Sequence, residues 1–231
     1  MENQKYLYLI LISYFVLKCL YILTDKILQK NKNYLLLFND RKLYVVKNII
    51  KSIVLVSISI FDINTISEIL FNGIYTKESI IRIGIIYGIN DTYGLINVPG
   101  LNFSTKIHHS VTTILCISTI FFDYNNLGYL KGLIYYAVFS ILCGSVNGYL
   151  SYRFIFPKSE YRFYFKKFAY YNYLICFISE WLYQYYVIIN YLIDYSYHNY
   201  IYHTGFILYF CSIHLIMYDD IKLIEYLRKD A

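Results

Sequence analysis

The chain alternates between long apolar stretches and short segments in which the charged residues gather. A helix needs about 20 predominantly apolar residues to cross the hydrocarbon core of a bilayer. Seven stretches approach this length: Tyr6–Leu23, Leu43–Phe61, Ile80–Ile96, Ile107–Phe122, Leu130–Leu150, Tyr170–Ile193 and Tyr200–Tyr218. The pattern therefore predicts an all-α, polytopic transmembrane bundle of about seven spans, in which a six-helix core follows an N-terminal anchor.

A soluble protein with several buried helices is the alternative to this prediction. Its helices should carry a polar stripe at helical spacing, yet Tyr6–Leu17 and Ile114–Phe122 are apolar all round. Between the second and third spans, Asp62–Ser79 is amphipathic and too interrupted by polar residues to cross a bilayer. We expect this segment to lie at the membrane interface.

The basic residues provide an independent test, because cytoplasmic loops carry an excess of lysine and arginine. With seven spans, fourteen of these residues fall in segments on one side of the membrane and two fall on the other. The N-terminus is therefore predicted to lie outside and the C-terminus in the cytoplasm. Lys18, Lys47 and Lys51 lie in the cytoplasmic halves of their spans, and we expect them to extend to the head groups.

These spans divide the chain into three predicted parts. Residues 1–39 form a retained signal anchor and a basic loop, residues 40–220 form the transmembrane domain, and residues 221–231 form a cytoplasmic tail. The first span has no Ala-x-Ala-like cleavage site, which favours an anchor over a removed signal peptide. The final Arg228-Lys229-Asp230-Ala231 resembles a dibasic retrieval signal. In a eukaryotic or viral protein it would indicate the endoplasmic reticulum or a related endomembrane.

Composition narrows the choice of function further. Of the 231 residues 58% are hydrophobic, a figure that includes 31 tyrosines, and this excludes a disordered chain. The net charge of +6 is explained by basic loops facing anionic lipid, so membrane lipids rather than nucleic acid are the expected partners. The five cysteines form no C-x-x-C pair, and we predict no metal site and no bound cofactor.

Ionisable side chains inside spans are costly and usually face the bundle interior. Several polar residues are predicted to share the cytoplasmic half of the bundle or the middle of the membrane: Asn90, Asp91, His108, His109, Asn147, Arg153, Glu180 and His214. A common depth on different spans predicts a polar pocket inside the bundle. The small residues Ser140, Gly144 and Gly148, at four-residue spacing, predict close helix packing.

The fourth span has the most specific pattern. Thr105, His108, Thr112, Cys116 and Thr119 follow three- and four-residue steps and form one polar stripe, and His109 lies beside it. A neutral imidazole can accept a proton near neutral pH, and an acid can orient it. We therefore predict His108 and His109 as catalytic bases and Asp91 as the orienting acid, with Asn90, Thr112, Asn147, Arg153, Glu180 and His214 as substrate-binding residues. The alternative is that these groups only form hydrogen bonds between helices.

Three further motifs stand out: Tyr87-Gly-Ile-Asn-Asp91, Lys106-Ile-His-His-Ser-Val-Thr-Thr113 and Gly144-Ser-Val-Asn-Gly-Tyr-Leu-Ser-Tyr-Arg153. Together they resemble the TLC-domain family, which includes the ceramide synthases. The resemblance implies a helical bundle around a lipid-accessible cavity and, in the synthase branch, acyl transfer from acyl-CoA with the paired histidines. The synthases carry acidic residues in the next span, whereas Leu130–Leu150 has none. The chain is thus closer to the non-synthase members.

Two other functions compete with lipid binding or modification. A channel or transporter would use Asp91, Glu180 and the histidines as a path, although we find no inverted repeat. A non-catalytic membrane protein would use the same side chains to hold helices together. A membrane di-iron enzyme is disfavoured, because the five histidines form neither H-x-x-x-H nor H-x-x-H-H clusters.

Overall fold

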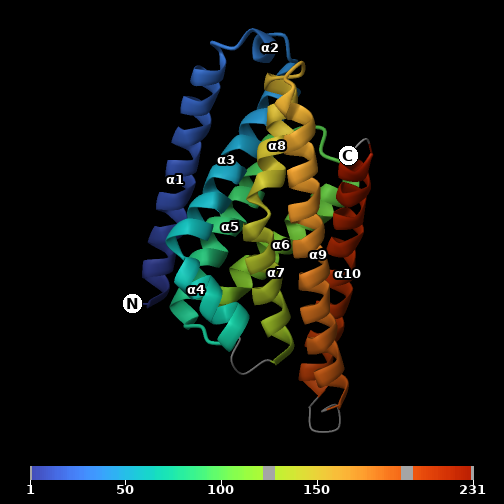
Figure 1. Ribbon diagram of the computed structural model, residues 1–231. Coiled ribbons are helices and arrows are strands. Elements are labelled where there is room, and N and C mark those ends of the chain that lie inside the picture. Colours follow the sequence, from blue (N-terminus) through green and yellow to red (C-terminus); the bar gives the residue numbers. More distant parts are fainter. Residues whose placement is uncertain (1, 122–127, 194–199, 230–231) are drawn as a thin grey trace.

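A computed structural model describes residues 2–121, 128–193 and 200–229 of the chain (Figure 1). Over these ranges the protein is all helical, with no strand, which confirms the all-α part of the predicted fold class. The elements are α1 (Glu2–Leu28), α2 (Lys32–Leu35), α3 (Asn39–Phe61), α4 (Ile63–Ser67), the π-helical turn η1 (Glu68–Asn72), α5 (Lys77–Asn97), α6 (Phe103–Phe121), the 3₁₀ turn η2 (Gly128–Leu130), α7 (Lys131–Leu142), α8 (Gly144–Ile155), α9 (Tyr161–Ile193) and α10 (Tyr200–Arg228).

The described part of each predicted apolar stretch lies on one long helix, or on the end of η2 with α7 and α8; Phe122 lies outside the described residues. By length and composition, two helical segments could cross a membrane, Gln4–Leu28 and Asn39–Phe61. A third is added if the bent pair α7 and α8 forms one span. The described helices thus include two or three candidate spans, and seven spans are not confirmed.

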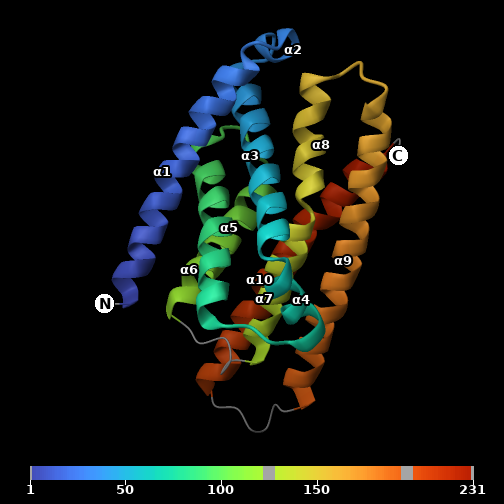
Figure 2. The same cartoon turned by 60° about the vertical axis from the view of Figure 1, so that its left-hand side comes forward.

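The long helices run alternately up and down the bundle (Figures 1 and 2). One end of the bundle holds α2, the 98–102 connection, the turn between α8 and α9, and the end of α10; we call it the α2 end. The opposite end holds α4 and η1, and the N-terminus lies toward it. Every connection at the α2 end belongs to the side that the charge pattern assigns to the cytoplasm.

The predicted span Leu130–Leu150 is broken, because α7 and α8 meet at an angle of 40° around Cys143. Carbonyl groups freed by the break are satisfied from neighbouring helices, as buried backbone requires. The Ser52 hydroxyl donates to the Gly144 carbonyl at 2.8 Å, and the Asn172 amide donates to the Leu142 carbonyl at 3.0 Å. The break is therefore held in place from both α3 and α9.

Small residues allow α8 to approach α3 closely, as their spacing predicted. A Cβ atom on Gly144 would lie 3.1 Å from a methyl carbon of Val56 and 3.2 Å from Cβ of Leu55. On Gly148 it would lie 3.0 Å from the Ser52 hydroxyl. Substituting a larger residue at either glycine would push these two helices apart.

The interior changes in character along the bundle axis. Toward the α4 end, apolar side chains such as Ile58, Ile66, Ile69 and Ile134 form the largest buried cluster. Toward the α2 end, the buried residues include Lys47, Lys51, Asp91, His109 and Asp220. The buried charged side chains thus lie toward one end of the bundle.

Two predicted segments differ in detail from the structure. Residues 221–228 continue α10 as helix, so the predicted tail at 221–231 is not separate from the bundle over its described part. The predicted interfacial segment Asp62–Ser79 forms α4, η1 and a short connection before α5. Asp62 in this segment makes an ion pair with Arg82 of α5.

Candidate functional site

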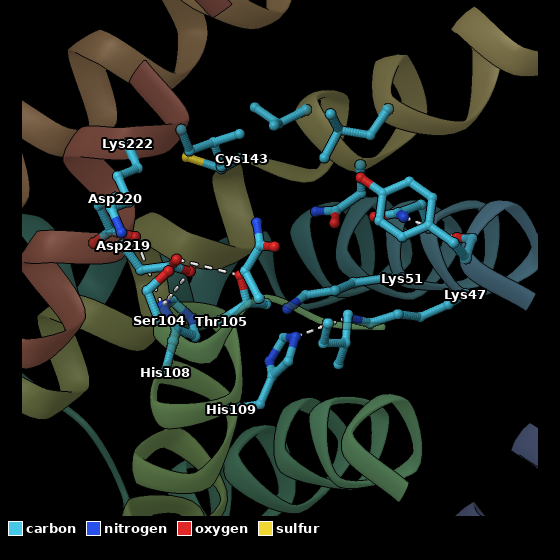
Figure 3. A pocket seen from close by; sticks show the side chains of 18 of the residues that line it. Lys47, Lys51, Ser104, Thr105, His108, His109, Cys143, Asp219, Asp220 and Lys222 are labelled. Atoms are coloured by element: carbon cyan, nitrogen blue, oxygen red, sulfur yellow. Dashed lines mark hydrogen bonds and ion pairs between the residues drawn. The ribbon is translucent and has the colours of Figure 1, made fainter. Parts of the chain in front are cut away.

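A cavity of about 580 Å³ occupies the α2 end of the bundle. Its walls come from α3, α6, α7, α8, α9 and α10, together with the 99–102 connection. Figure 3 shows Lys47, Lys51 and His109 on one side of it, and Asp219, Asp220 and His108 on the other. The two histidines therefore lie between a group of lysines and a group of aspartates.

His109 faces the lysine side. Its Nδ1 lies 3.2 Å from Oδ2 of Asp91, an ion-pair contact whose alignment falls outside hydrogen-bond geometry. Its Nε2 lies 2.7 Å from Nζ of Lys47. The predicted pairing of a histidine of α6 with Asp91 of α5 is thus found at His109.

Asp91 is the centre of this side and is fully buried. Nζ of Lys51 donates to its Oδ1 at 2.5 Å, and the Thr112 hydroxyl lies 3.1 Å from its Oδ2. The buried carboxylate is therefore compensated by an ammonium group and a hydroxyl, which is what a charge requires in an apolar interior.

His108 faces the acidic side. Its Nδ1 lies 3.7 Å from Oδ2 of Asp219 and 3.8 Å from Oδ1 of Asp220, both too long for a hydrogen bond. Its Nε2 lies 3.1 Å from the Tyr136 hydroxyl. The Tyr173 hydroxyl donates to Asp220 at 2.8 Å. One imidazole thus has aspartates beside it and a phenol at its other nitrogen.

Asp220 lies beyond Tyr218, where the seventh predicted span ends. Burial raises the pKa of its carboxyl group to about 7, and the neighbouring Asp219 adds to this effect. The hydrogen bond from Tyr173 and the charge of Lys51 act in the opposite direction. The protonation state of Asp220 therefore changes close to neutral pH.

The predicted substrate-binding residues divide into two groups. Asn147, Arg153 and Glu180 line the cavity, and Oε1 of Glu180 has no hydrogen-bond partner among the described residues. The guanidinium group of Arg153 lies over the rings of Phe154 and Tyr226, at 4.7 and 4.8 Å from their centres.

The remaining three lie elsewhere. Thr112 contacts Asp91 behind the cavity wall. Asn90 is buried on α5 outside the cavity lining, and its amide has no hydrogen-bond partner in the described part of the chain. His214 is also outside the lining; its Nδ1 lies 2.8 Å from the Phe210 carbonyl, and its ring packs on Trp181. The structure thus places Asn90 and His214 away from a ligand in this cavity.

Sequence analysis missed the two lysines and the two aspartates of the cavity. The expectation that Lys47 and Lys51 extend to the head groups is wrong, because they are only 4% and 8% exposed and point into the bundle. A signal was present: Lys47 and Lys51 share a helical face with the buried Leu55 and Ile58. Asp220 continues the buried face of Ile213 and Ile216 in the same way.

Asp91, His108 and His109 bring three potential metal-ligand atoms within 4.8 Å of one another. The set fits a cation poorly, because two of its groups already contact amines. Lys51 holds Asp91, and Lys47 holds Nε2 of His109. A metal ion would have to enter beside two ammonium groups and displace them, which like-charge repulsion opposes.

Comparison of the chain with family models, with curated proteins and with solved structures gives no match. The TLC-domain resemblance of the three motifs therefore stays a prediction.

Proposed function

We propose that this protein is a multi-pass membrane protein of TLC type that binds a lipid in the cavity at the α2 end and modifies it by acyl transfer. The pair His108 and His109, half-buried and buried respectively and placed between lysines and aspartates in one cavity, is the observation that carries the proposal. Charged groups are buried only where they are paired or used.

The outer surface supports the membrane part of the proposal. Large apolar side chains are exposed on several long helices, for example Phe15, Ile60, Ile114, Ile178 and Leu208. Apolar patches of this extent on a surface mark contact with lipid or with another protein. With lysines and aspartates inside, this is the arrangement expected in a bilayer, where lipid surrounds the bundle and polar groups face inward.

The two sides of the cavity support a division of the chemistry. His108 is suited to act as the general base on a hydroxyl or amine, because Asp219 and Asp220 stabilise the imidazolium ion that forms. The lysine side offers positive charge for an acyl carbonyl oxygen as negative charge develops on it. Acyl-CoA is the acyl donor in this proposal, and the donor enters from the cytoplasmic side, to which the charge pattern assigns the α2 end.

The position of the cavity favours this function over a channel. Its lining residues come from the α2 half of the bundle, whereas the other half holds most of the largest apolar cluster. A permeation path would need polar groups along the whole axis. A role limited to helix packing would also leave unexplained why Oε1 of Glu180 and Nδ1 of His108, on two residues that line the cavity, have no hydrogen-bond partner within the described ranges.

Lipid profiles of cells expressing variants test the proposal. His108→Ala should abolish the lipid change caused by the wild-type chain, by a factor of about 100 or more, as loss of a general base does. His214→Ala is the matched control, because its imidazole lies outside the cavity lining. Equal membrane insertion is verified for all chains. A His108→Ala profile equal to that of the wild type would refute acyl transfer at this site.

A further inference from the structure

Lys47 is a buried amine to which the proposed acyl transfer assigns no covalent role. It enters the cavity from α3, and it is only 4% exposed. Buried lysines are usually neutralised by a carboxylate. Lys51, one turn further on, has Asp91, whereas within the described residues no carboxylate lies at ion-pair distance from Lys47. The polar contact of Lys47 is instead Nε2 of His109, at 2.7 Å.

Asp91, His109 and Lys47 form a connected series. The carboxylate lies at Nδ1 of the imidazole, and the amine lies at Nε2. A negative charge at Nδ1 favours the tautomer with its proton there, and the lone pair of Nε2 then points at the amine. This is the order of acid, base and nucleophile that activates a serine or cysteine in hydrolases, with an amine as the nucleophile.

We propose that Lys47 is a nucleophilic amine that captures a long-chain aldehyde as a reversible imine. The proposal uses the same cavity as the acyl transfer, but it depends neither on acyl transfer nor on His108. An aldehyde is the class that fits, since a primary amine and an aldehyde need no further reactant. An activated acyl group would instead form a stable amide with Lys47, and the amine could then react no further.

The steps balance without an oxidant or reductant. Lys47 transfers one ammonium proton to His109, and the neutral amine attacks the carbonyl carbon. The N–C bond forms as the carbonyl π bond opens, and the alkoxide takes a proton from His109 to give a carbinolamine. One of the two protons that remain on the nitrogen passes through His109 to the hydroxyl group, the C–O bond breaks, and water leaves with the protonated imine formed. Asp91 stays ionised throughout and stabilises the imidazolium.

The walls around the amine suit an alkyl tail. Leu55, Val146, Leu150 and Phe177 line the cavity together with the charged groups. A tail on these apolar side chains would place its aldehyde carbon among Lys47, Lys51 and His109. The ammonium of Lys51 remains bound to Asp91 and can polarise the carbonyl oxygen.

Reductive trapping tests the proposal on the full chain in detergent micelles. Dodecanal is the probe, cyanoborohydride reduces any imine to a stable secondary amine, and peptide mass spectrometry locates the product. We expect Lys47 to be alkylated about tenfold or more faster than the exposed Lys18 of α1, because general-base catalysis contributes factors of this size or larger. His109→Ala should remove that advantage, and Lys47→Arg should give no adduct at position 47.

The controls separate this inference from the acyl transfer. His108→Ala should leave the trapping at Lys47 within about twofold while abolishing the lipid change, because His108 does not contact Lys47. If His109→Ala does not insert or fold, His109→Gln, which keeps a polar side chain, is measured instead. The proposal would be overturned if the exposed lysines were alkylated faster than Lys47. It would also be overturned if Lys47 were alkylated at the same rate in the His109 variant as in the wild type.

Discussion

The two sides of the cavity contain adjacent histidines with opposite surroundings. His109 is held between Asp91 and Lys47, at 3.2 and 2.7 Å, in a network that also binds Lys51. His108 is held more loosely, with Asp219 and Asp220 both more than 3.5 Å away. The comparison teaches that neighbouring positions on a helix can have different chemistry, because a rotation of about 100° per residue turns them toward different helices.

The largest effect is expected on the tightly connected side. Asp91→Asn should lower the free energy of unfolding by about 3–5 kcal/mol, because it leaves the buried Lys51 ammonium without its counterion. Thermal unfolding in detergent measures this. Asp62→Asn is the matched control; it breaks the half-exposed pair with Arg82 and should cost about 1 kcal/mol or less. Equal losses in the two variants would show that the buried pair Asp91–Lys51 contributes no more to stability than the half-exposed pair Asp62–Arg82.

A smaller effect that depends on pH is expected on the acidic side. The pKa of Asp220 is about 7 in the folded chain, against an ordinary value of 3.8. Below about pH 4 the carboxyl group is protonated in both states and contributes nothing to the pH dependence. As pH rises from about 4 to 7, the unfolded chain loses this proton while the folded chain keeps it, so the stability of the wild type falls, and it levels off above about pH 7.

Asp220→Asn removes that loss, and its amide oxygen can still accept from Tyr173. We expect the variant to be more stable than the wild type by about 1–2 kcal/mol at pH 8 and similar to it at pH 4; the full shift in pKa would set a ceiling of about 4 kcal/mol. Unfolding midpoints of the wild type and of Asp220→Asn, measured between pH 4 and pH 8, test this expectation. A stability difference independent of pH would mean that Asp220 stays ionised throughout.

Much of the fold was predictable, because long apolar runs can bury or face lipid only as helices. The contact between Asp91 and His109 was predictable too: a five-residue connection joins α5 to α6, so the end of one helix lies beside the start of the next. The inward position of Lys47 and the position of His214 outside the cavity lining were not predictable, for a common reason. The spans predict the depth of a residue in the bundle, but the side it faces depends on how its helix is rotated, and that is set by the neighbouring helices.

The smallest effect is expected at the mouth of the cavity, where Arg153 of α8 reaches across to α10. Its guanidinium group stacks on Phe154 and Tyr226 and donates to the Tyr226 hydroxyl. Arg153→Lys keeps the charge but loses the planar stacking, so a cost of about 1 kcal/mol is expected in thermal unfolding. Arg162→Lys, at an exposed position of α9, is the control and should change stability by less than about 0.5 kcal/mol. Because Arg153 contacts neither histidine group, both the lipid change and the trapping at Lys47 should persist in Arg153→Lys. If Arg153→Lys lost only the lipid change or only the trapping at Lys47, Arg153 would be shown to act on one side of the cavity alone.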